Sequence, residues 1–95
     1  MSRFQIAHVR EQGQDIIIIP LDRSFGYKSS REQTQITQAL QVSASAAGLA
    51  GTVVPVWEHT AGRMAFIAPP PWRNFFQSLS LSIVARMINR ELICS

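Results

Sequence analysis

The stretch Ile16-Ile17-Ile18-Ile19-Pro20 decides the fold of this chain. Four β-branched residues in succession are typical of a β-strand, and a proline is tolerated only at the end or the edge of a strand. Successive side chains of a strand point to opposite faces of the sheet, so Ile16 and Ile18 share one face while Ile17 and Ile19 share the other. Both faces of this strand therefore need an apolar cover.

The segments around the isoleucines indicate a hairpin followed by a helix. Residues 3–10 alternate imperfectly between two faces, as in a strand, and the polar turn 11–15 joins them to the isoleucines. Two patterns with the spacing of a helix capping box follow: Ser29-x-x-Glu32 and Ser30-x-x-Gln33. A helix is therefore predicted over about 30–47.

A second hairpin and a last helix are predicted after this one. The strand candidates are residues 52–58 and 63–68, with a turn at Gly62 between them and three prolines, 69–71, behind them. A helical stretch is expected from residue 72, interrupted near Ser80 or Ser82. Its apolar residues recur with the spacing of an amphipathic helix: Ile83, Val84, Met87, Ile88 and Leu92.

These elements give the order ββα twice, in the half-units 1–50 and 51–95. Four identities relate the halves at an offset of 49 residues: Gly13/Gly62, Ile18/Ile67, Pro20/Pro69 and Ser29/Ser78. A duplication and a coincidence of two similar hairpins both explain them. In either case we predict one α+β domain, 1–95, built as a two-layer sandwich. In it, two helices cover one face of a four-stranded, mainly antiparallel sheet.

Length and composition limit the chain to one domain with a real core. Of its 95 residues, 46% are hydrophobic and 16% are charged. Domains centre on about 100–150 residues, and the usual charged share is about 25%. Intrinsic disorder is therefore excluded, and an unusually apolar surface is expected.

An interaction surface is predicted from this excess of apolar residues. If two helices cover one face of the sheet, the other face keeps an apolar patch, and such patches mark partner sites. We expect a small, non-enzymatic domain that binds a protein partner, most simply as a homodimer. The predicted interface residues are Ile16, Ile17, Ile18, Ile19, Trp57 and Phe66.

Binding of nucleic acid or another polyanion is the alternative. The net charge is +3, and eight of the nine cations are arginines, whose planar guanidinium groups bind phosphate through two hydrogen bonds. Aromatic residues lie among the cations in 25–31 and at Trp72-Arg73, as in proteins that stack single-stranded bases. The residues predicted for this alternative are Lys28, Ser30, Arg31, Arg73, Arg86 and Arg90.

Groups that could carry catalysis or hold a metal are sparse. His8 and His59 are the only histidines, and the side chains of His59 and its neighbour Glu58 diverge if they lie on a strand. The single cysteine, Cys94, excludes an intramolecular disulfide and a zinc site built on cysteines. We therefore expect no catalytic activity, no cofactor and no metal.

The start of the chain and its apolar runs bear on its location. Residues 1–5 lack the apolar core of a signal peptide. No apolar run approaches the ~20 residues that cross a bilayer as a helix. We therefore expect a cytoplasmic protein that makes no membrane contact.

Overall fold

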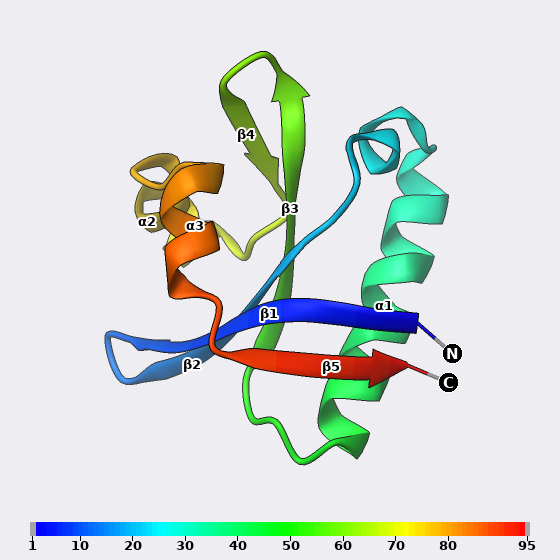
Figure 1. The fold of residues 1–95 in the computed structure, drawn as a ribbon, viewed down its shortest axis with the longest axis vertical. Helices are drawn as coiled ribbons and strands as arrows, with labels where there is room; N and C mark the ends of the chain where they lie inside the picture. Colours follow the sequence, from blue (N-terminus) through cyan, green and yellow to red (C-terminus); the bar gives the residue numbers. More distant parts are fainter. Residues whose placement is uncertain (1, 95) are drawn as a thin grey trace.

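The computed structural model describes residues 2–94 of the chain. The strands in this range form one mixed β-sheet. It consists of five strands: β1 (Ser2–Glu11), β2 (Gln14–Pro20), β3 (Thr52–Thr60), β4 (Arg63–Phe66) and β5 (Arg90–Cys94). Their order across the sheet is β4-β3-β2-β1-β5 (Figure 1). The two end residues of the predicted domain, Met1 and Ser95, lie outside the described residues.

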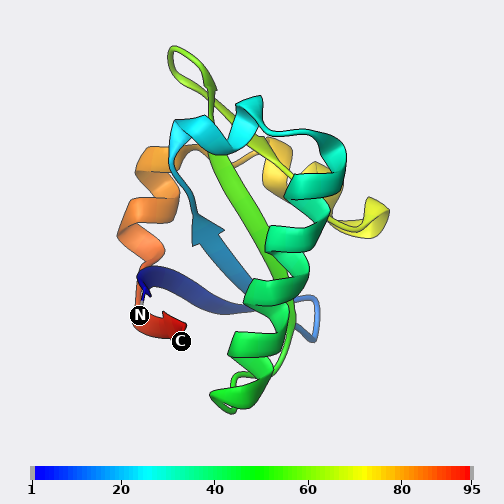
Figure 2. The same ribbon diagram turned by 90° about the vertical axis from the view of Figure 1, so that its right-hand side faces the viewer.

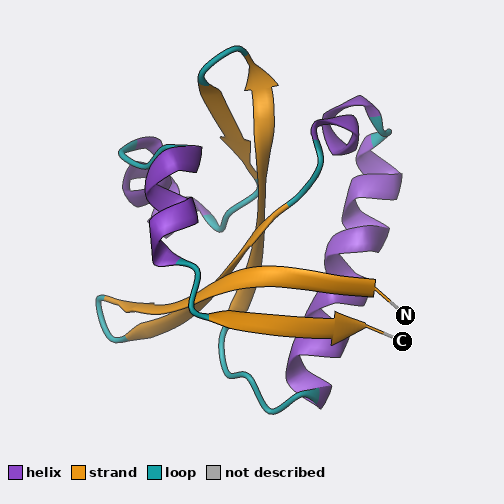
Figure 3. Ribbon diagram, in the orientation of Figure 1, coloured by secondary structure: helices purple, strands orange, loops and turns teal. Residues whose placement is uncertain are grey.

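Three α-helices and two short 3₁₀ segments join the strands (Figure 3). Helix α1 (Ser30–Ala46) lies between β2 and β3, whereas α2 (Arg73–Gln77) and α3 (Leu81–Met87) lie between β4 and β5. The 3₁₀ segments are η1 (Arg23–Tyr27), before α1, and η2 (Pro70–Trp72), before α2. Within residues 2–94, no helix combines the length and the apolar character needed to cross a membrane.

Strand β2 is central, and its two neighbours run in different directions. It pairs antiparallel with β1, where Ile17 lies opposite His8, and parallel with β3, where Ile17 lies opposite Val53. A parallel pair needs a long crossover connection, and α1 provides it. Strand β1 is divided between two partners, because residues 7–11 pair with β2 and residues 2–6 pair with β5.

Helices cover both faces of this sheet. Helix α1 packs on the face of Ile17 and Ile19, and α2 and α3 pack on the face of Ile16 and Ile18. Figures 1 and 2 both show α1 on one side of the central strands and α3 on the other. All four isoleucines are fully buried as a result.

The α+β class is confirmed, but the predicted two-layer arrangement is wrong. A cover on one face alone would leave two of the four isoleucines in water, at a cost of roughly 1.5–3 kcal/mol for each side chain. Instead, α1 covers the face of Ile17 and Ile19, and α2 and α3 cover the face of Ile16 and Ile18. Both pairs of isoleucines are therefore buried. The sheet has five strands rather than four, and the order ββαββα is followed by β5.

Strand β5 replaces the end of the predicted last helix. Helix α3 begins after Ser80, whose Oγ accepts a hydrogen bond from the Ile83 N–H at 3.3 Å. It ends at Met87, because Ile88 adopts an extended ψ of 123°. The chain then turns back along the N-terminal half of β1, whose backbone groups have no partner in β2.

Candidate interaction surface

The predicted interface residues do not form an exposed face. Ile16 to Ile19 are fully buried by the helices of this same chain, and Trp57 is 7% exposed. Phe66 is half-buried and packs with Phe76 of α2 at a ring distance of 5.5 Å. The sheet faces that carry these residues are therefore covered by helices of this same chain, α1 on one face and α2 and α3 on the other.

The residues predicted for polyanion binding lie on several different elements. Lys28, Ser30 and Arg31 lie at the start of α1, while Arg73 opens α2, Arg86 lies in α3 and Arg90 opens β5. The start of α1 is on the opposite side of the sheet from α2 and α3 (Figure 1). The structure therefore brings the first three residues together but does not join all six into one surface.

Three of the other arginines are neutralised by carboxylates. The ion pairs are Arg3–Glu91 at 3.8 Å, Arg10–Asp15 at 4.0 Å and Arg23–Glu58 at 3.9 Å. Their side chains are largely exposed, so each pair contributes at most about 1 kcal/mol to stability. They reduce the number of cations available to an anionic partner.

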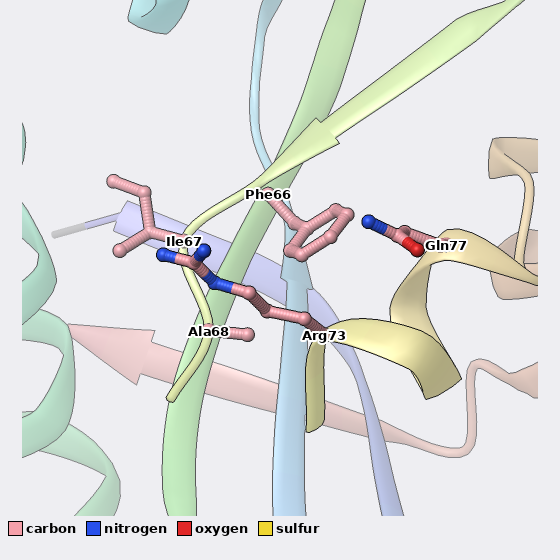
Figure 4. A pocket seen from close by; sticks show the side chains of 5 residues that line it. All are labelled: Phe66, Ile67, Ala68, Arg73 and Gln77. Carbon is pink, nitrogen blue, oxygen red and sulfur yellow. The ribbon is translucent and has the colours of Figure 1, made fainter. Parts of the chain in front are cut away.

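Arg73 lines an open pocket beside the end of β4 (Figure 4). Its guanidinium group lies near Ile67, and the amide of Gln77 lies near Phe66 on the other side of the pocket. Ala68 completes the lining. One cation and one amide, both exposed, give this pocket neither an acid–base pair nor a nucleophile.

The two histidines have separate positions. The ring Nε2–H of His8 donates a hydrogen bond of 2.8 Å to the Ala50 carbonyl, which ties β1 to the loop before β3. His59 is exposed near the end of β3. Among residues 2–94, no group of three or more His, Cys, Asp or Glu side chains is placed to hold a metal ion.

On the β4 side of the sheet, the part of β3 that extends beyond β4 has few backbone groups free for another strand, while β4 itself, four residues long, pairs with no described strand on its outer side. Strand β4 covers only part of β3. Beyond it, the Gln41 side chain of α1 donates to the Gly51 carbonyl at 3.0 Å and accepts from the Val53 N–H at 2.8 Å. Pro55 has no N–H to offer, and its carbonyl accepts from the Ile67 N–H at 3.2 Å.

The other edge, formed by β5, is open. Strand β5 pairs with β1 on one side, with Leu92 opposite Phe4, and no described strand pairs with its other side. Leu92 is 1% exposed and packs with the core under α1, whereas Ile93 points to the other face and is 49% exposed. An unpaired strand edge presents a row of N–H and C=O groups that another strand can bind.

Asn89, the residue just before β5, holds this edge strand in place. Its side-chain Oδ1 accepts from the His8 N–H at 2.8 Å, and its Nδ2 donates to the His8 carbonyl at 2.9 Å. Its own N–H donates to the Ile6 carbonyl at 3.0 Å. The side-chain amide of Asn89 thus bonds to the N–H and C=O of His8 as the backbone of a neighbouring strand would. These bonds fix the position at which β5 starts.

An uncharged part of α1 lies beside the open edge. A shallow pocket of about 310 Å³ is lined by Val42, Ser43, Ala46, Ala47 and Ile93. Val42 is 69% exposed, and the C-terminal end of α1 extends past the open edge of β5 (Figures 1 and 2). No charged residue occurs between Glu32 and Glu58. We call the open edge of β5 together with these five residues the α1–β5 surface.

Comparisons with known protein families, with curated proteins and with solved structures found no match for this chain. A candidate function is therefore inferred from the geometry of the α1–β5 surface. The sequence shows the absence of charge around α1, which is a usable signal for this surface. It does not show the open edge, because that edge depends on the pairing of β5 with β1.

Proposed function

We propose that this chain is a non-enzymatic protein-interaction domain that self-associates through the α1–β5 surface. The observation that carries the proposal is the open edge of β5, five residues long, beside an uncharged helix face. Strand addition uses the unpaired backbone groups for affinity and the neighbouring side chains for specificity. Val42 and Ile93, both well exposed, would be covered by such a partner.

A second copy of the chain fits this surface for two reasons. The cores of protein interfaces are depleted of charged residues, as the α1 part of the surface is. The surface also offers one strand edge, and two identical edges can pair about a two-fold axis, which is the commonest symmetry of soluble oligomers.

Sedimentation of the purified chain over a range of micromolar concentrations tests self-association. We expect a reversible dimer that is weakened at least tenfold by Val42→Glu and by Ile93→Glu, since each places a charge in the buried seam. Ile83→Glu is the matched control, because Ile83 is 41% exposed on α3, away from the α1–β5 surface. A strict monomer at every concentration, or an equal loss with Ile83→Glu, would contradict the proposal.

Polyanion binding remains a second candidate, and one observation favours it. The cations predicted for it, Lys28, Arg31, Arg73, Arg86 and Arg90, make none of the ion pairs found in the described part of the chain. Binding of single-stranded nucleic acid would weaken steeply with added salt, because it releases counterions. An apolar dimer contact would persist or strengthen in the same titration.

A further inference from the structure

We infer that two copies join β5 to β5 in antiparallel orientation, with Leu92 of one copy opposite Leu92 of the other. This inference rests on the proposed self-association and adds its register. The two sheets would then form one continuous sheet of ten strands, with both α1 helices on the same face. Three observations carry this register: the side-chain parity of β5, its pattern of charges and the lack of a cation at the end of α1.

Parity restricts the symmetric registers of two β5 strands. Residues that lie opposite each other in an antiparallel pair share a face of the sheet, so a two-fold axis places one residue opposite its own copy. Near the middle of β5 that residue is Glu91, Leu92 or Ile93. Glu91 would face another carboxylate, which is destabilising. A register centred on Ile93 would pair only residues 92–94 among the five described residues of β5. Leu92 pairs all five residues of the strand.

Charges fit the register centred on Leu92. Glu91 would lie opposite Ile93 of the second copy and on the same face. Within each copy, Arg3 lies opposite Ile93 across the β1–β5 pair and forms an ion pair with Glu91. Each Glu91 therefore has the Arg3 of its own copy beside it. On its other side lies Ile93 of the second copy, and beyond that residue, on β1 of the second copy, lies the second Arg3. The seam holds two carboxylates and two guanidinium groups and no like charges directly opposite.

Arg90 finds a specific place in the same register. It would lie opposite Cys94 of the second copy, on the face that Cys94 shares with the core under α1. The pocket beside that position is lined by α1 residues and Ile93. The C-terminal end of a helix carries a partial negative charge, and α1 has no basic residue in its last turn. The aliphatic part of Arg90 would fill the pocket, with its guanidinium group at the last carbonyls of α1.

Disulfide cross-linking of the Arg90→Cys variant tests the register. Opposite residues of an antiparallel pair have Cα atoms about 4.5–5.5 Å apart, within the range that a disulfide spans. Positions 90 and 94 of one strand are about 13 Å apart, so they cannot be joined within one chain. Oxidised glutathione, which takes up the two electrons released by the two thiols, should therefore give a covalent dimer. Mass spectrometry should find the new cysteine joined to Cys94 of the other chain.

Glu91→Cys is the matched control, since it places a thiol on the opposite face of the same strand. It should give little covalent dimer under conditions that cross-link Arg90→Cys. A non-covalent dimer without the 90–94 link, or equal cross-linking of both variants, would overturn the register and leave self-association intact. A strict monomer of the unmodified chain in sedimentation would instead refute the self-association on which the register depends.

The role given to Arg90 has its own measurement. Arg90→Gln keeps the length of the side chain but removes its charge, and it should weaken the dimer about two- to fivefold. Arg86→Gln, an exposed arginine of α3, should leave the dissociation constant unchanged. An equal effect of the two substitutions would remove Arg90 from the interface.

Discussion

Gly26 shows how a single missing side chain makes room for an aromatic ring. Trp57 packs against Phe25 of η1, edge to face, with ring centroids 4.9 Å apart. Its indole Nε1 is buried without a hydrogen-bond partner among the described residues. A Cβ atom at Gly26 would lie 2.7 Å from this nitrogen, closer than side chains approach one another. The indole ring thus occupies the space that any other residue at position 26 would need.

Gly26→Ala should therefore destabilise the fold by roughly 1–3 kcal/mol, as overpacking of a filled core does. Urea unfolding followed by circular dichroism measures this change in the free energy of unfolding. In the Trp57→Phe background the indole nitrogen is gone, so the same substitution should cost clearly less. An equal cost in both backgrounds would show that the ring is not what Gly26 accommodates.

Helix α1 is stabilised at its start by a reciprocal cap. The Ser29 Oγ accepts from the Glu32 N–H at 3.1 Å, and the Glu32 carboxylate accepts from the Ser29 N–H at 3.3 Å and from its hydroxyl at 3.1 Å. These bonds to the backbone and side chain of Ser29 lower the pKa of Glu32 below its ordinary value of 4.5. The folded chain therefore favours the ionised carboxylate.

Ser29→Ala should lower the free energy of unfolding by about 1 kcal/mol near neutral pH, the usual effect of losing a cap. Because the folded-state pKa of Glu32 is lowered, its contribution is present above the unfolded pKa and is lost as the pH falls through the folded pKa. The difference in the free energy of unfolding between the variant and the original chain should therefore shrink in acid. Thermal unfolding at neutral pH and at acid pH would show this. Thr34→Ala, at an exposed position of α1, is the control. A difference that does not change with pH would rule out this role of Glu32.

The elements whose signals are local could be predicted from the sequence. The isoleucine strand, the capped helix at 30–47 and the second hairpin were expected, and the structure has β2, Ser30–Ala46 and the β3–β4 pair at those places. Strand β5 was not expected, because the spacing of Ile88 and Leu92 also suits a helix. What decides between the two is the unpaired half of β1, eighty or more residues earlier in the chain.

The candidate surface was predicted poorly for a related reason. Burial of Ile16 to Ile19 depends on which face each helix covers, and the sequence leaves that choice open. The connection that contains α1 and the connection that contains α2 and α3 each carry enough apolar residues to cover one face. Only the packing in the structure shows that they cover opposite faces. The exposed apolar residues of the α1–β5 surface, Val42 and Ile93, are single positions with no distinguishing pattern in the sequence.

At the scale of the whole molecule, β2 is the most protected element. It is flanked by strands on both sides and by helices on both faces. We therefore expect the amides of Ile16 to Ile19 to exchange hydrogen only through global unfolding, whereas those of β4 exchange through local opening. Hydrogen exchange with residue resolution would check this. The amides of β5 that face outward should slow as the protein concentration rises, and exchange independent of concentration would argue against pairing at that edge.

The shortened edge on the β4 side has a consequence for how an assembly can grow. A sheet with long open edges on both sides could add copies at both ends and extend into a fibre. The amide of Gln41 occupies backbone groups of β3 that an incoming strand would need, and Pro55 lacks the N–H for one more bond. Gln41 thus confines the free edge on this side to the four residues of β4, and we expect growth of the sheet to be less favourable there than along the whole of β3.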